Sequence, residues 1–120
     1  MSTEFAIAAA SNAASRMLQA PCIIVFTKSG FSARIVAARR PGVPIVVLTD
    51  RPRTHRQLAL VWGVVPVLVP HAATYEEMAR TARQVLLERK LARSGDRVVV
   101  TAGVPFDVPG TTNMLKVEQV

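Results

Sequence analysis

Residues 22–26 of the chain read C-I-I-V-F, a continuous apolar run that follows Pro21 and ends at the polar stretch Thr27 to Gly30. A short apolar run without alternation, bounded by turn residues, is typical of a strand that is buried on both faces. Strands of this kind occur mainly where helices cover both sides of a parallel sheet. The segment therefore predicts an α/β fold.

Further apolar runs of similar length follow along the chain. They read P-I-V-V-L at residues 44–48, V-V-P-V-L-V at 64–69 and R-V-V-V-T at 97–101, and a last segment at 113–117 is a fifth strand candidate. Pro66 interrupts the second of these runs, and a proline cannot donate a hydrogen bond to a sheet ladder. We therefore expect the 64–69 strand to lie at an edge, or to have Pro66 near its start.

The first helical pattern covers residues 4–19, with Ser2 or Thr3 available as the N-cap and Pro21 just beyond its end. Apolar side chains recur there at helical spacing, and we expect a helix whose alanines permit close packing on the core. The residues are Ile7, Ala10, Ala14, Met17 and Leu18.

Three more helical patterns alternate with the strands. They cover residues 31–40, the stretch from a cap at Thr49 or Asp50 to about Val61, and residues 75–92. In the first of these Ile35 and Val36 point inward, and in the last Thr74 and Glu77 have the spacing of a capping box.

The alternation predicts one domain over residues 1–120, a three-layer α/β/α sandwich with about five strands. Helical crossovers make the sheet mainly parallel. Residues 102–112 differ because they contain Gly103, Pro105, Pro109 and Gly110 and have no helical pattern. We therefore expect the last strand to return antiparallel at the sheet edge.

Composition limits the possible classes of protein. The 120 residues are 50% hydrophobic and 19% charged, which excludes a disordered chain, and the net charge of +7 favours anionic partners. The uncharged run 58–70 is too short for a membrane span. The first basic residue, Arg16, comes too late for a signal peptide, and the single cysteine, Cys22, forms no internal disulfide. We therefore expect a cytoplasmic protein in which Cys22 is a buried apolar residue.

Ligands of open α/β sheets bind beyond the carboxyl ends of the strands, so the loops there are the candidate sites. The loop after the first strand reads T-K-S-G-F-S and enters a helix. Three hydroxyls, one ammonium and the free N–H groups of a helix start make a phosphate-binding loop. The alternative is that the serines only cap the helix. The candidate binding residues are Thr27, Lys28, Ser29, Gly30, Phe31 and Ser32.

Two other loops are weaker candidates. Residues 49–56 hold a basic cluster that either binds an anion or an acidic partner, or is a solvated face; its members are Arg51, Arg53, His55 and Arg56. The loop 103–110 either closes over a ligand held by the first loop or is an edge connection without function.

The remaining polar and aromatic residues suggest no chemistry. Asp50, Asp96 and Asp107 each lie beside a turn, as expected of caps, and no acid/base pair or catalytic triad is evident. His55 and His71 lack metal-site spacing. We expect Trp62 to be a core or interface anchor.

Several long segments in the correct order resemble the C-terminal domain of pyruvate kinase over almost the whole chain. They read V-F-T-K-S-G-F-S-A-R (25–34), R-P-G-V-P-I-V-V-L-T (40–49), L-A-L-V-W-G-V-V-P-V-L-V (58–69), G-D-R-V-V-V-T-A-G-V-P (95–105) and P-G-T-T-N-M-L-K-V (109–117).

This resemblance implies a role in a glycolytic enzyme that transfers a phosphoryl group from phosphoenolpyruvate to ADP. In that family the chemistry, with its Mg²⁺ and K⁺ ions, lies in a barrel domain that would precede residue 1. The resemblance therefore implies no cofactor and no catalysis in this chain alone. The family's C-terminal domain has an allosteric effector site and part of the tetramer interface.

By position, the resemblance assigns two loops to the effector site. Residues 27–32 correspond to the phosphate-holding loop, and 103–110 to the loop that closes over the effector; the residues that we assign in the second loop are Gly103, Val104, Pro105 and Gly110. Enzymes activated by fructose 1,6-bisphosphate use a tryptophan and an arginine in the segment that aligns with 71–79, which here has neither. AMP, ribose 5-phosphate or a hexose monophosphate is therefore a better expected effector.

Two hypotheses follow from the sequence. In the first, the chain is the regulatory and oligomerisation domain of a pyruvate kinase, inactive alone, which forms a homo-oligomer with the closing strand as a possible dimer edge. In the second, it is a free-standing relative that senses a small molecule or binds a partner. Nucleic-acid binding is disfavoured because the few aromatic residues lie mostly inside apolar runs, and no membrane partner is expected.

Overall fold

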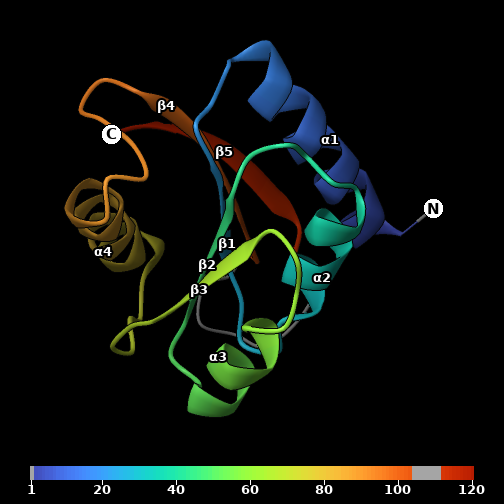
Figure 1. Cartoon of the computed structure of the whole chain (residues 1–120). Helices are drawn as coiled ribbons and strands as arrows, with labels where there is room; N and C mark the ends of the chain where they lie inside the picture. The colour runs from blue at the N-terminus through green and yellow to red at the C-terminus, as the bar shows by residue number, and fades with distance from the viewer. Residues whose placement is uncertain (1, 104–111) are drawn as a thin grey trace.

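Five strands form one sheet in the order β3-β2-β1-β4-β5 among the residues that the computed structural model describes, 2–103 and 112–120 (Figure 1). The strands are β1 (Ile23–Phe26), β2 (Ile45–Thr49), β3 (Val64–Leu68), β4 (Arg97–Ala102) and β5 (Met114–Gln119). The first four are parallel and β5 runs antiparallel to β4. The predicted α/β fold, with a mainly parallel sheet and an antiparallel last strand, is confirmed.

Four helices connect and cover these strands. They are α1 (Thr3–Met17), α2 (Phe31–Ala38), α3 (Pro52–Leu58) and α4 (Tyr75–Glu88). Helices α1 and α2 lie on one side of the sheet and α4 on the other (Figure 1). The core follows the same division, because Ile23 and Val25 pack with Val36 of α2, whereas Ile24 packs with Leu86 of α4.

Two of the three interior strands, β1 and β2, are buried along their whole length, as expected of parallel strands covered on both faces. At one edge, β3 pairs only with β2 among the described strands, and Pro66 lies opposite Val47 in the register. The predicted edge position of this strand is therefore confirmed, and the missing N–H of Pro66 is accommodated there.

The buried face of α1 differs in part from the periodic apolar pattern. Ser2 caps the helix, its hydroxyl accepting from the Phe5 N–H at 3.3 Å, but the side chain of Met17 is 84% exposed. The buried residues of α1 are Ala8, Ser11, Asn12 and Ser15. Of the periodic apolar residues, Ala14 and Leu18 do pack against the core cluster that contains Ala8, whereas Met17 does not.

The start of α3 also differs from the prediction. Its N-cap is Arg51, without a side-chain cap, and the helix ends at Leu58. The Thr49 hydroxyl accepts from the Arg51 N–H at 3.2 Å, one residue before the helix, and Asp50 is used elsewhere. Neither Thr49 nor Asp50 is the cap that the sequence suggested.

The capping box of α4 forms as predicted, with one change of partner. Thr74 accepts from the Glu77 N–H at 3.2 Å, and the Glu77 carboxylate accepts from the N–H of Ala73 rather than of Thr74, at 3.3 Å. The helix ends at Glu88, four residues before the predicted end. No helix among the described residues is long and apolar enough to cross a membrane.

Candidate functional site

The loop between β1 and α2 forms a tight turn at the carboxyl edge of the sheet. The Gly30 N–H donates to the Thr27 hydroxyl at 2.9 Å, and the Phe31 N–H donates to the Ser29 hydroxyl at 3.3 Å. Gly30 has a φ of +86°, which only glycine adopts without strain. The hydroxyls of Thr27 and Ser29 therefore close the turn, and Gly30 permits its backbone path.

Helix α3 packs against this loop. A Cβ atom added to Gly30 would lie 3.3 Å from both Leu58 Cδ2 and Thr54 Cγ2. The Thr54 hydroxyl also donates to the Lys28 carbonyl at 2.7 Å. Loop and helix are thus in close contact, and the loop conformation depends on α3.

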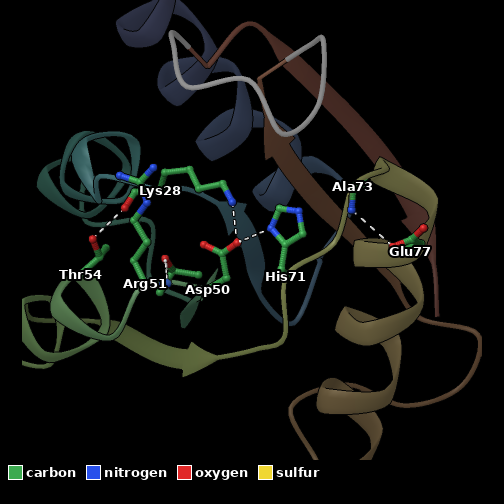
Figure 2. Close-up of polar contacts among 8 residues, drawn as sticks. Lys28, Asp50, Arg51, Thr54, His71, Ala73 and Glu77 are labelled. Atoms are coloured by element: carbon green, nitrogen blue, oxygen red, sulfur yellow. Dashed lines mark hydrogen bonds and ion pairs between the residues drawn. The ribbon is translucent and has the colours of Figure 1, made fainter.

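Asp50 joins the ends of three strands. Its Oδ2 accepts from Lys28 Nζ at 2.5 Å and contacts His71 Nδ1 at 2.9 Å, so residues from the segments after β1, β2 and β3 meet at one oxygen (Figure 2). The Asp50 side chain is only 11% exposed, whereas Lys28 is 26% and His71 61% exposed.

These contacts govern the ionisation of Asp50. Burial raises the pKa of the Asp50 carboxyl, but the hydrogen bonds and positive charges of Lys28 and His71 lower it by more. The net pKa lies below its usual value, so Asp50 is a carboxylate at neutral pH and neutralises part of the charge of Lys28.

The start of α2 reaches the segment that follows the predicted closing loop. The hydroxyls of Ser32 and Thr112 form a short buried hydrogen bond. Strands β1 and β4 are neighbours, so Gly103, directly after β4, lies at the same edge as the β1–α2 loop. The other predicted residues of the closing loop, Val104, Pro105 and Gly110, lie outside the described residues.

The weaker candidates are distributed over other surfaces. Arg51, Arg53 and Arg56 are exposed and His55 is partly buried, on and beside α3. No group of three or more potential metal ligands occurs among the described residues. This arrangement gives the α3 side of the loop a positive surface.

Cys22 and Trp62 lie away from the loop. Cys22 is fully buried, and burial together with the charge of Asp96 raises the pKa of its thiol to about 12. The expected role of Cys22 as a buried apolar residue is confirmed. Trp62 is 71% exposed, with the Arg40 guanidinium 4.7 Å from its ring centroid, so it is no part of the core of this chain.

Sequence reasoning missed the role of Asp50, which it interpreted as a turn residue. One signal was available: Lys28 and Asp50 each follow adjacent parallel strands by one or two residues, and parallel neighbours end at the same edge. His71 gave less warning, because it lies three residues beyond β3.

The sequence and the fold of the chain can be compared with those of known proteins. The family model described as pyruvate kinase, alpha/beta domain, matches residues 5–118. The chain belongs to the pyruvate kinase alpha/beta-domain family. The resemblance seen in the sequence is thereby confirmed.

Individual pyruvate kinases agree with this family assignment. A pyruvate kinase of Agrobacterium vitis is 42% identical over 114 residues, which cover 95% of this chain and 24% of the relative. One from Geobacillus stearothermophilus is 41% identical over 100 residues, covering 83% and 17%. A crystal structure of a pyruvate kinase from Cryptosporidium parvum matches with a TM-score of 0.91 at 25% identity, covering 99% of this chain and 23% of that one. The chain thus spans between 17% and 24% of the length of these pyruvate kinases.

Proposed function

We propose that this chain is the regulatory and oligomerisation domain of a pyruvate kinase, and that the β1–α2 loop binds the phosphate of a small effector. Phosphoryl transfer from phosphoenolpyruvate to ADP, with its Mg²⁺ and K⁺ ions, then belongs to a barrel domain outside these 120 residues. The domain alone has no catalytic activity in this proposal. Its role is to bind a metabolite and to connect subunits in the cytoplasm.

The observation that supports the site is how the loop hydroxyls are used. Thr27 and Ser29 accept hydrogen bonds from the Gly30 and Phe31 N–H groups. A hydroxyl that accepts such a bond keeps its own hydrogen as a donor. The turn is therefore held by the acceptor side of both hydroxyls, and their donor side is suited to a phosphate oxygen at the start of α2.

The charges around the loop favour an anion as well. Lys28 is part of the loop, and three arginines lie on or beside α3; they are Arg51, Arg53 and Arg56. Asp50 is the only carboxylate between residues 27 and 75. A dianion at the loop would therefore meet a positive surface, in which Asp50 is the one carboxylate of this segment.

The chemistry of the segment after β3 supports a ligand with one phosphate. Instead of a tryptophan and an arginine, residues 71–79 contain two acidic side chains in the first turn of α4, Glu76 and Glu77. Glu77 is engaged with the Ala73 N–H, and its carboxylate would repel a second phosphate placed there. We therefore propose AMP, ribose 5-phosphate or a hexose monophosphate rather than fructose 1,6-bisphosphate.

Calorimetric titration of the chain with these four ligands tests the site. We expect AMP or one of the sugar monophosphates to bind, and Ser29→Asp and Lys28→Glu each to abolish the heat, because both place negative charge at the loop. Ser94→Asp and Lys90→Glu are matched controls, because both residues are exposed in the connection between α4 and β4, at the other edge of the sheet. Undiminished binding in both loop variants would exclude this site.

The edge strand β5 supports the proposed oligomer. It pairs only with β4 among the described strands, and Val117 on it is 43% exposed. An unpaired strand edge with an exposed β-branched residue is suited to antiparallel pairing with a second copy across a two-fold axis. Sedimentation should therefore show a dimer that Val117→Lys weakens, and a monomer at high concentration would contradict this assignment.

A further inference from the structure

We propose that Asp50 is an internal competitor for the phosphate: it holds the Lys28 ammonium in the ligand-free state, and the ligand must draw Lys28 away while His71 keeps the Asp50 carboxylate hydrogen-bonded. This inference rests on the proposed anion site and adds a means by which the chain sets its own affinity. It makes Asp50 and His71 determinants of affinity although neither belongs to the β1–α2 loop.

The geometry of the three side chains is that of a shared acceptor. Lys28 Nζ and His71 Nδ1 both bind Asp50 Oδ2, at 2.5 and 2.9 Å, and they reach it from different directions (Figure 2). Because both donors bind the same oxygen, either one alone gives the Asp50 carboxylate a hydrogen-bond partner. Loss of Lys28 from this oxygen leaves the bond to His71 in place.

The backbone of Lys28 is fixed while its side chain is long and flexible. The Lys28 carbonyl accepts from the Thr54 hydroxyl at 2.7 Å, which anchors the residue on α3. Four methylene groups separate the ammonium from this anchor, so it can exchange one oxygen partner for another without movement of the loop. A phosphate dianion at the loop offers the ammonium three acceptor oxygens and more charge than one carboxylate.

The charge distribution explains why an internal competitor has a large effect here. Between residues 27 and 75 there are seven Lys and Arg residues and a single carboxylate, that of Asp50. Its side chain is only 11% exposed, so water screens its attraction for Lys28 weakly. A carboxylate that is largely shielded from water is destabilised when it loses every partner, and His71 supplies the partner that makes the exchange possible.

The test is a double-mutant cycle on ligand affinity. The chain, Asp50→Asn, His71→Leu and the double variant are titrated by calorimetry at pH 8 and constant ionic strength, with ribose 5-phosphate and, separately, inorganic sulfate. Sulfate is fully ionised at pH 8 and does not titrate near it, so it separates the effect on anion binding from any change in the protonation of the ligand. Glu88→Gln is the control for net charge, because it removes one exposed carboxylate on α4.

We expect Asp50→Asn to bind at least about tenfold more tightly, since the competing charged hydrogen bond is gone. His71→Leu should bind the ligand more weakly, by a factor of about three or more. When Lys28 leaves in this variant, Asp50 has lost the hydrogen bonds from both Lys28 and His71. In the Asp50→Asn background the His71→Leu change should have no effect. This non-additivity separates partner exchange from a general effect of charge, which would act equally in both backgrounds.

Each contrary result has a distinct meaning. Binding by the unmodified chain that Asp50→Asn leaves unchanged or weakens would overturn the exchange and leave the anion site intact. An equal gain from Glu88→Gln, or equal losses from His71→Leu in both backgrounds, would also overturn it. Absence of binding in all variants would overturn the anion site and the exchange together, whereas binding by Asp50→Asn alone would support both.

Discussion

The carboxyl and amino edges of the sheet differ in the side chains that gather there. At the carboxyl edge, side chains from the segments after β1, β2 and β3 are joined by hydrogen bonds through Lys28, Asp50 and His71. At the amino edge, the segments before β2 and β3 line an open apolar pocket of about 350 Å³, and Trp62 is one of the lining residues. The same strands thus end in a polar network on one side and in an apolar hollow on the other.

This difference follows from the parallel arrangement. In a parallel sheet every strand presents its C-terminus at the same edge, so polar residues placed just after several strands meet there even though they are far apart in sequence. The amino edge receives the ends of the helices instead, and here it has two tight turns, at Gly42 and Gly63. The polar side chains that the proposed ligand site uses lie at the first edge, whereas the second has an apolar pocket.

The largest test compares two residues four positions apart. Leu58 is fully buried beneath the carboxyl-edge loop, whereas Trp62 is exposed at the amino edge. Leu58→Ala should lower the free energy of unfolding by about 3 kcal/mol, through lost burial and a cavity. Trp62→Ala should lower it by less than about 1 kcal/mol, since an exposed ring loses little on truncation. Urea unfolding of both variants measures this, and equal losses would remove the contrast between the two edges.

The sequence was sufficient to identify the strands of the sheet, because the pattern of each strand is a local property of the chain. The run at residues 22–26 is apolar on both faces, and Pro66 marks an edge through its missing N–H, so strand type and one edge position could be inferred. The antiparallel return of β5 followed from a connection without helical pattern. These properties depend on neighbouring residues only.

The errors concern features that depend on distant residues. Met17 belongs to the periodic apolar residues of α1, yet it is exposed, whereas Ser11 and Ser15 are buried. Asp50 was taken for a cap because its partners, Lys28 and His71, lie more than 20 residues away on either side. Trp62 was expected to be a core or interface anchor, but it is 71% exposed and its ring contacts the Arg40 guanidinium. Steric fit and long-range pairing therefore set the limit of inference from local patterns.

A second test uses two glycines with nearly the same backbone angle. Gly30 at the carboxyl edge and Gly63 at the amino edge have φ values of +86° and +82°. Alanine at either position should cost about 1 kcal/mol in backbone strain. At Gly30 the new Cβ also lies 3.3 Å from Leu58 and Thr54, whereas at Gly63 it meets nothing within 4 Å.

We therefore expect Gly30→Ala to cost about 2 kcal/mol and Gly63→Ala about 1, measured by thermal or urea unfolding. The difference between the two variants isolates the steric contact, since the strain is shared. A loss for Gly63→Ala as large as that for Gly30→Ala would show that α3 does not support the loop in the way described.

A third test uses acid. The folded-state pKa of Asp50 is lowered, so its contribution to stability is present above about pH 4, its unfolded value, and is lost as the pH falls through the folded pKa. Asp50→Asn should therefore lower the free energy of unfolding by about 1 kcal/mol at pH 7. The difference should vanish at a pH where the Asp50 carboxyl is protonated in both the folded and the unfolded protein. Urea unfolding of the two proteins from pH 7 to pH 2 measures the difference. A constant difference across this range would mean that the pairing with Lys28 and His71 does not stabilise the fold.

The smallest test applies alkali to Cys22, which lies directly before β1 at the amino edge. Burial and the charge of Asp96 raise the pKa of its thiol to about 12, so the folded state excludes the thiolate. The resulting stability is complete below pH 9 and is lost as the pH rises from 9 towards 12. Cys22→Ala should cost about 1 kcal/mol at pH 7, and this cost should disappear by about pH 10. Tyr75, whose pKa burial and two nearby glutamates also raise to about 12, is present in both proteins and cancels in the difference. If the cost of Cys22→Ala were the same at pH 7 and pH 10, the thiol would ionise as easily inside the fold as outside it, and the amino edge would be open to water where the sheet begins.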